Sequence, residues 1–207
     1  MLNISRNLTL TLALCAAPVF AQDGQLYETP SDPDASFVRI VSPGDTLAVV
    51  ATNTFDAVQG GVTPYVTMPA GMVTVSVGDL AGKEEILAAS FYTFITGTDG
   101  ALHMVKDTIS NSPAKADLVI YNLSDLPQID LYVPSVDAVA LAGITQNTSH
   151  DVTLKAPLTL DFEIRDGAST LATLPAIAMQ RRAGVTVVFS GADGDYTAFS
   201  TENLYIN

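Results

Sequence analysis

Short runs of β-branched and aromatic residues recur along most of the chain, and apolar and polar positions alternate inside many of them. Gly, Pro, Asp and Ser separate the runs at regular intervals, which is typical of the turns in a β-sandwich or barrel. No segment keeps apolar residues at helical spacing for long, although residues 83–90 could form a helical turn or two. The pattern predicts strands at residues 36–41, 47–51, 65–68, 72–77, 91–95 and 102–105, and again at 116–121, 129–133, 136–141, 151–155, 158–164, 176–180, 185–189 and 196–199.

The strand pattern stops at the Asn-Ser-Pro-Ala sequence of residues 111–114 and then starts again. This linker predicts a first sandwich domain at 36–110 and a second at 115–207, each large enough for a small core. We therefore expect an all-β fold of two tandem antiparallel β-sandwich domains that arose by internal duplication. The segments that match between the halves, in the same order, are 37–40 with 118–121, 73–79 with 160–166, and 92–100 with 186–194.

The first residues have the features of a secretory signal peptide. Arg6 precedes an almost unbroken apolar run at 8–20, and compact residues stand where a signal peptidase reads the chain before Ala21. We expect cleavage after Ala21, which removes 1–21 and places the mature protein outside the cytoplasm. Residues 22–35, rich in Asp, Pro and Gly, would then form an extended N-terminal segment.

Thiolate chemistry and metal binding are not expected in the mature protein. Cys15 is the single cysteine, and it would leave with the signal peptide because Leu14 before it does not fit a lipidation motif. The acidic turns at 97–100 and 193–195 lack the ligand series of a calcium loop, and their Asp and Gly residues suit the backbone angles of turns. We therefore predict neither a metal site nor a cofactor.

The chain is acidic, with 9 Lys and Arg residues against 22 Asp and Glu residues and a net charge of −13. This charge argues against nucleic acid, which binds cationic surfaces. It also argues against an anionic polysaccharide, unless Arg clusters or a divalent cation intervene locally. Arg181 and Arg182 form an adjacent basic pair, so this pair and Arg39 are the places where an anionic partner would dock. The alternative is that they only balance charge on an acidic surface.

The two histidines offer no ready catalytic site. A serine-type hydrolase or acyltransferase needs a nucleophile, a base and a group that orients the base. Ser149, His150 and Asp151 supply these residue types, but neighbouring side chains on a strand point to opposite faces, so we expect only a polar loop there. His103 is expected on the solvent face of a strand. The sequence predicts a protein that is not an enzyme; a hidden site would need a histidine beside a carboxylate and a hydroxyl in a cleft.

Three stretches carry a resemblance to a known family. The first runs Asp-Gly-Gln-Leu-Tyr at 23–27, then Pro30, then Ala-Ser-Phe-Val-Arg-Ile at 35–40. The second opens the second half with Lys-Ala-Asp-Leu-Val-Ile-Tyr-Asn-Leu-Ser-Asp at 115–125, and the third is Ile-Arg-Asp-Gly at 164–167. In order and spacing, over essentially the whole mature chain, the sequence resembles the alginate O-acetylation accessory protein family, AlgF.

The resemblance implies a periplasmic protein with paired β-sandwich domains, required for O-acetylation of an exported polysaccharide, alginate or a similar polymer. Such proteins are expected to bind the O-acetyltransferase proteins of the periplasm and inner membrane rather than to transfer acetyl groups. Strand edges and an extended segment suit binding by β-augmentation. The partner-binding residues that we expect are Leu26, Tyr27, Phe37, Arg39, Arg181 and Arg182. Leu26 and Tyr27, apolar side chains in a polar segment, could equally dock on their own domain.

The alternative function is that of a glycan-binding sandwich module of the cell envelope. Such modules usually stack aromatic side chains on sugar rings, whereas this chain has no Trp and its 7 Tyr residues are scattered. A solvent-exposed row formed by Tyr65, Tyr92 and Tyr132 would favour this alternative.

Overall fold

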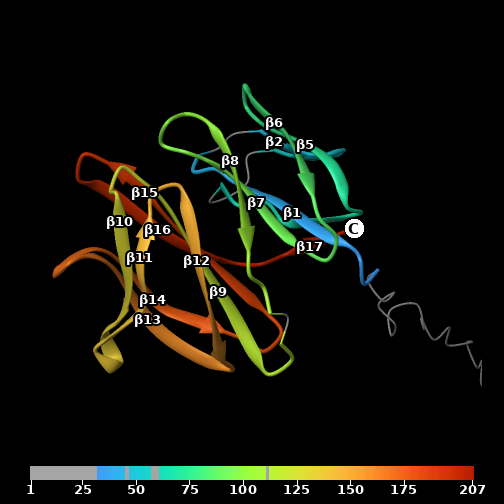
Figure 1. The fold of residues 1–207 in the computed structure, drawn as a ribbon. Helices are drawn as coiled ribbons and strands as arrows, with labels where there is room; N and C mark the ends of the chain where they lie inside the picture. The colour runs from blue at the N-terminus through green and yellow to red at the C-terminus, as the bar shows by residue number, and fades with distance from the viewer. Residues whose placement is uncertain (1–31, 45–46, 57–60, 111) are drawn as a thin grey trace, which may run out of the picture. The chain divides into compact units, whose positions relative to one another are not determined.

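The computed structural model describes residues 32–207 except 45–46, 57–60 and 111, and residues 32–207 form one compact unit (Figure 1). The expected signal peptide and most of the expected extended segment, including Leu26 and Tyr27, lie outside the described residues. The described part is built of β-strands with a 3₁₀ turn at η3 (Pro134–Val136), which confirms the all-β prediction. No helix among these residues is long and apolar enough to cross a membrane.

The first β-sandwich consists of two sheets that share an apolar core. The order of the larger sheet is β17 (Tyr205–Ile206), β4 (Tyr65–Met68), β1 (Ser36–Val41), β7 (Phe91–Thr96) and β8 (Leu102–Asp107). The order of the facing sheet is β3 (Asn53–Phe55), β2 (Ala48–Val50), β5 (Gly71–Val77) and β6 (Leu80–Ile86). Val38 and Phe94 of the larger sheet pack with Val75 and Ile86 of the facing sheet, as the alternation of apolar positions along each strand requires.

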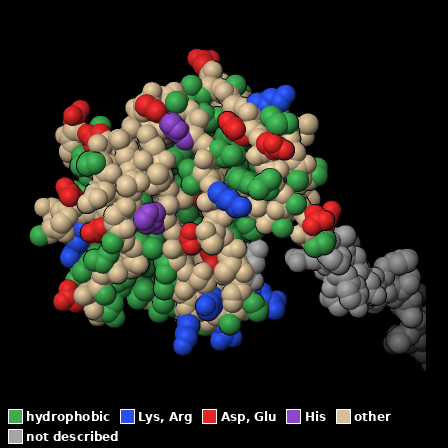
Figure 2. Space-filling view, in the orientation of Figure 1, with side chains coloured by type: hydrophobic (Ala, Val, Ile, Leu, Met, Phe, Trp, Pro, Cys, Tyr) green, Lys and Arg blue, Asp and Glu red, His purple; other side chains and the backbone are tan. Residues whose placement is uncertain are grey.

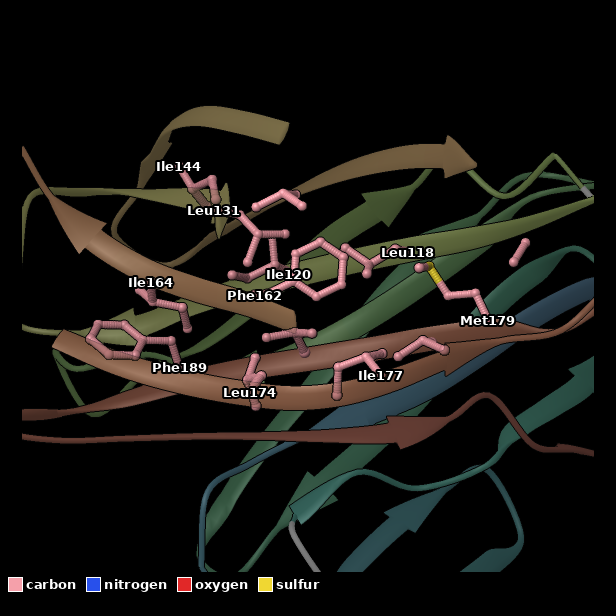
Figure 3. Packing of buried hydrophobic residues seen from close by; sticks show 14 of the residues in the cluster. Leu118, Ile120, Leu131, Ile144, Phe162, Ile164, Leu174, Ile177, Met179 and Phe189 are labelled. Carbon is pink, nitrogen blue, oxygen red and sulfur yellow. The ribbon is translucent and has the colours of Figure 1, made fainter. Parts of the chain in front are cut away.

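The second β-sandwich has the same construction. The order of its first sheet is β12 (Thr148–Lys155), β9 (Lys115–Ser124), β15 (Gly184–Ala192) and β16 (Asp195–Glu202). The order of its second sheet is β11 (Ala138–Thr145), β10 (Gln128–Val133), β13 (Leu158–Asp166) and β14 (Ser169–Met179). Figure 3 shows the core between them, where Ile120 and Phe189 of the first sheet pack with Phe162 and Leu174 of the second.

The strand connections confirm the internal duplication. Strands β1 to β8 of the first sandwich and β9 to β16 of the second occupy the same sheet positions in the same order. In each half the first strand pairs in parallel with the seventh, β1 with β7 and β9 with β15, while the other pairs inside each half are antiparallel. The register agrees too, because Val38 lies opposite Tyr92, and Val119 lies opposite Thr186. All three segment matches expected from the sequence fall on equivalent strands.

The parallel strand pairs are buried on both faces. One face of β1 and β7 packs on the core of the first sandwich, and the other face meets β9 and β15 in a separate apolar cluster. This cluster includes Val41 and Ile95 of the first sandwich and Val119, Tyr121 and Val188 of the second. Strands that are buried on both faces tend to have nearly continuous apolar sequences, as residues 118–121 of β9 and 187–189 of β15 do.

Three local features differ from the sequence predictions. Residues 83–90 do not begin a helical turn: Lys83, Glu84 and Glu85 lie in β6, an edge strand whose charged side chains are exposed. Charges of this kind protect a free edge from pairing with other chains. They also interrupt the pattern of apolar residues from which a strand is predicted. Residues 149–151 lie in β12 rather than in a polar loop. Strand β17 belongs to the second half of the sequence but pairs with β4 of the first sandwich (Figure 1).

Candidate functional site

Arg39 lies at the centre of a buried polar cluster between the two sandwiches. It sits in the middle of β1, and its register partner on β7 is Thr93, whose hydroxyl accepts a hydrogen bond from Nε at 3.0 Å. Nη1 donates to the side-chain carbonyl of Asn203 at 3.0 Å, and Nη2 donates to the Tyr121 hydroxyl at 3.0 Å. The guanidinium also lies over the Tyr65 ring, 4.2 Å from its centroid. A fully buried arginine is thus supplied with partners on all sides.

Asp107, at the end of β8, carries the opposing charge of the cluster. Tyr65 donates to its Oδ2 at 2.8 Å, Thr93 donates to the same oxygen at 2.5 Å, and Tyr121 donates to Oδ1 at 2.5 Å. The distance from Arg39 Nη2 to Asp107 Oδ2 is 4.0 Å, so hydroxyl groups stand between the two charges and bond to both. We call Arg39, Tyr65, Thr93, Asp107, Tyr121 and Asn203 the interface network.

Burial and the two opposite charges determine the protonation states in this network. Burial alone would lower the pKa of Arg39, but Tyr121, Tyr65 and Asp107 together raise that pKa above its ordinary value. Burial raises the pKa of Tyr121, with Asp107 adding to the shift and Arg39 opposing it. The pKa of Tyr65 is raised for the same reasons. Arg39 therefore stays charged and both tyrosines stay protonated, which is the state that their hydrogen bonds require.

The interface network joins the two halves of the chain. Arg39, Thr93 and Asp107 come from the first sandwich, whereas Tyr121 comes from β9 of the second. Asn203 follows β16, and its side-chain oxygen accepts from both Arg39 and the Thr186 hydroxyl. Its Nδ2 atom is buried without a hydrogen-bond partner in the described structure, so the residue works here as an acceptor. Apart from this atom, the polar groups of the six members bond to one another or to neighbouring side chains at the contact between the sandwiches.

Three aromatic rings, those of Phe37, Phe91 and Tyr205, extend the network toward the surface. Phe37 stacks on Phe91, its register partner, with the ring centroids 4.5 Å apart. Tyr205 of β17 stacks on Tyr65 at 5.4 Å and meets Phe37 edge to face at 5.8 Å. Tyr205 is 43% exposed and the neighbouring Leu204 is 60% exposed. The outer edge of β17 and these two side chains therefore form an accessible apolar strip next to the buried charges.

Neither histidine sits in the constellation that acyl transfer needs. His103 lies on β8 and contacts the carboxylate of Asp99, on the preceding turn, at 3.0 Å, and no hydroxyl bonds to His103 in the described structure. His150 lies on β12 between Ser149 and Asp151, which point to the other face of the strand. The Ser149 hydroxyl instead donates weakly to Asp107 at 3.5 Å. Among the residues that the structure describes, no group of three or more His, Cys, Asp or Glu side chains could hold a metal ion.

The expected partner-binding residues fall in different places. Phe37 is half-buried in the aromatic group, and Arg181 and Arg182 are exposed in the turn between β14 and β15. Arg39 was expected to meet an anionic partner, but its side chain is fully buried, so its anionic partner is Asp107 of the same chain. One signal pointed to this: Arg39 interrupts an apolar strand, and an arginine buried on a central strand needs an internal acid. Asp107 and Asn203 carried no comparable signal.

The tyrosines expected to form a glycan platform do not form a row. Tyr65 and Tyr92 are buried in the first sandwich. Tyr132 lies on β10 of the second sandwich, where the Arg165 guanidinium covers its ring at 3.3 Å and its hydroxyl bonds to Asp137. Tyr196, outside the expected row, is tied to Asp125 through its hydroxyl. The exposed tyrosine row that would have favoured a glycan-binding module is therefore not formed by these three residues.

Comparisons with known proteins agree with the family resemblance. The family model described as alginate O-acetyl transferase AlgF matches residues 9–186. The alginate biosynthesis protein AlgF of Pseudomonas syringae pv. tomato is 22% identical over 188 residues, which cover 87% of this chain and 82% of that protein. AlgF of Azotobacter vinelandii is 24% identical over 174 residues, covering 83% and 79%. The solved C-terminal domain of AlgF from P. aeruginosa has a TM-score of 0.38 and 20% identity, covering 44% of this chain and 99% of that domain. Because the family model spans most of the sequence, this chain belongs to the AlgF family.

Proposed function

We propose that this chain is a periplasmic, non-catalytic accessory protein for the O-acetylation of an exported polysaccharide, alginate or an alginate-like polymer, and that it binds the acetyltransferase machinery. The observation that carries the proposal is that, in this member of the AlgF family, the interface network holds the two sandwiches together. Its charged and hydroxyl side chains are all bonded internally, so they support a fixed pair of sandwiches rather than a reaction. What remains for a partner is a surface of strand edges and exposed apolar side chains.

The absence of a relay supports a binding role. Acyl transfer through a side chain needs a nucleophile whose proton a neighbouring base can take. In the described part of the chain, Ser149 bonds to the carboxylate of Asp107, which already accepts three other hydroxyls, and His150 lies on the opposite face of the same strand. The family description names acetyl transfer, and a protein that binds the transferring enzyme accounts for that name without reactive residues of its own.

The accessible strip on β17 is the surface that we assign to the protein partner. The outer edge of β17 has no neighbouring strand in the described sheet, and Leu204 and Tyr205 stand exposed beside it. A free edge supplies main-chain hydrogen bonds to an added strand, and the flanking side chains supply specificity. The ring of Phe37 packs edge to face against the ring of Tyr205. Leu26 and Tyr27, in the segment that precedes Asp32, stay proposed as further partner contacts.

The test compares the O-acetyl content of the secreted polysaccharide from a strain that lacks this protein with that from a complemented strain. We expect the acetyl groups to be lost while the polymer yield is unchanged. Complementation with Leu204→Glu should restore the protein but little acetylation, because a charge replaces an exposed apolar anchor. Val136→Glu is the matched control, since Val136 is 66% exposed at η3 of the second sandwich. Unchanged acetylation in the deletion strain would sink the proposed function, and equal behaviour of the two variants would sink the β17 surface.

A further inference from the structure

We propose that Lys115, Lys155, Arg181 and Arg182 form a docking site for the carboxylates of a linear anionic polysaccharide. We call these four residues the basic end, because they lie together at one end of the second sandwich. The proposal rests on the proposed function, since it assigns to the accessory protein a direct contact with a uronate polymer. Its four cations are distinct from the apolar strip of β17, which adjoins the basic end at Tyr205.

Strand register and two hydrogen bonds bring the four residues together. Lys115 and Lys155 are opposite each other in the antiparallel pair of β9 and β12. The backbone N–H of Arg182 donates to the carbonyl of Lys115 at 3.1 Å, which places the turn beside the start of β9. Nε of Arg181 donates to the carbonyl of Ala156 at 2.9 Å, which places its guanidinium beside the end of β12. The terminal nitrogens of Arg181 stay available for a second acceptor.

The fold alone does not account for this gathering of charge. Like charges directly opposite on neighbouring strands are destabilising, so Lys115 and Lys155 oppose folding where they stand. Arg182 also has a positive φ of 62°, a conformation that costs a residue with a side chain about 1 kcal/mol. All four side chains are exposed, and none of them makes an ion pair within the described part of the chain. A site that costs stability and is left without internal ion pairs fits a role in binding.

The contrast with the rest of the molecule adds to the argument. The chain has 9 Lys and Arg residues against 22 Asp and Glu residues, yet four of the cations meet in one place. Figure 2 shows Lys and Arg side chains gathered at the lower end of the face in view, while Asp and Glu side chains are scattered over the remainder. Two acids lie near: Asp117 is buried and accepts from Ser110 and Thr153, and Glu202 is exposed at the end of β16. The local charge stays positive in an otherwise repulsive field.

The chemistry of the adjacent surface favours a polysaccharide over an acidic protein. A small hollow beside the basic end is lined by Lys115 and Arg182 together with the hydroxyl-bearing side chains of Ser112 and Tyr205. Asp117 also lines it, and its carboxylate accepts hydrogen bonds from Ser110 and Thr153. Cations and hydroxyls side by side match a sugar unit that carries both a carboxylate and hydroxyl groups. A repeating carboxylate would also allow several cations to engage neighbouring units of one chain, which increases the avidity.

The experiment measures binding of the purified protein to an unacetylated oligouronate by calorimetry at low and at physiological salt. A neutral oligosaccharide of equal length and a polyglutamate peptide serve as comparison ligands. We expect the oligouronate to bind, the neutral sugar not to bind, and the affinity to fall as salt screens the charges. Lys155→Gln and the double variant Arg181→Gln/Arg182→Gln should each weaken binding, by roughly tenfold for each charge-assisted hydrogen bond that the substitution removes.

Lys83→Gln is the matched control, because Lys83 is an exposed lysine on β6 of the first sandwich and its replacement removes one positive charge, as Lys155→Gln does. Thermal melts check that each variant is folded. No oligouronate binding, or equal binding by all variants, would overturn the proposal, and polyglutamate binding as well as the oligouronate would assign the basic end to an acidic protein instead. Normal acetylation in the deletion strain, with oligouronate binding intact, would overturn the proposed function and leave the basic end standing.

Discussion

The guanidinium of Arg39 is shielded from water. In place of water it contacts the Thr93 hydroxyl, the Tyr121 hydroxyl, the Asn203 oxygen and the Tyr65 ring. Each donor points at a fixed acceptor, so the desolvation cost of the guanidinium is offset only when both sandwiches are in place. A residue of this kind adds specificity to an interface that apolar contacts alone would leave free to slide.

Arg39→Met should destabilise the protein by about 3 to 5 kcal/mol, because it leaves the carboxylate of Asp107 buried without a compensating charge. Urea unfolding measures the change in the free energy of unfolding. Arg165→Met is the control: Arg165 pairs with Glu163 at 2.6 Å near the surface, so its replacement should destabilise the protein far less than Arg39→Met does. Equal destabilisation in the two variants would mean that Arg39 contributes only as a surface residue does.

At the scale of elements, β17 is the strand that ties the end of the second half to the first sandwich. Tyr205 lies opposite Tyr65 in a parallel pair, and the N–H of Tyr65 donates to the carbonyl of Leu204 at 2.8 Å. Asn203, just before β17, bonds to Arg39. The strand is short, but it places an aromatic ring over the interface network and completes one edge of the larger sheet.

Deletion of residues 204–207 should lower the free energy of unfolding by about 2 to 3 kcal/mol, because it removes the Tyr205 ring and the main-chain bonds of β17. Chemical unfolding followed by circular dichroism measures the change, and the spectrum of the folded state should stay that of a β protein. Leu204→Ala removes only an exposed side chain and should change stability by less than about 0.5 kcal/mol. A deletion as mild as Leu204→Ala would show that β17 does not fasten the sandwiches.

For the whole molecule, the two sandwiches share one buried cluster of opposite charges and hydroxyls. Tyr65 belongs to the first sandwich and Tyr121 to the second, and both donate to Asp107. The protonation of the network therefore affects the contact between the halves rather than one half alone.

The stability of the protein should fall as the pH rises above about 10. Burial raises the pKa of Tyr121 and of Tyr65 in the folded state, so above the ordinary tyrosine pKa the unfolded chain releases protons that the folded chain keeps. The contribution of the two tyrosines to the free energy of unfolding is fully present below the ordinary tyrosine pKa. It decreases as the pH rises toward their raised pKa values in the folded state, by up to about 1.4 kcal/mol per pH unit for each tyrosine. Urea unfolding at several pH values measures this slope, and Tyr121→Phe should reduce it. A flat profile between about pH 9 and about pH 11 would contradict the buried hydroxyls.

Local sequence by itself determined the strands, the turns between most of them and the repeat of one unit. The central strands were visible because burial on both faces demands uninterrupted apolar side chains, as in 118–121 and 187–189. Edge strands were harder: β6 carries Lys83, Glu84 and Glu85, whose exposure serves to protect the edge and leaves no hydrophobic signal. The exposed pair Arg181 and Arg182 could be noted from the sequence, but not its neighbours Lys115 and Lys155.

Only the tertiary structure decided what the charged residues meet. Arg39 and Asp107 are far apart in the sequence, and Asn203 lies at the other end of the chain, so no spacing rule could join them. Strand register placed Lys115 opposite Lys155, and one-residue slips in register would have separated them. Alternation along a strand tells which face a side chain takes, whereas the partner across that face depends on how sheets pack, and packing is a property of the folded chain as a whole.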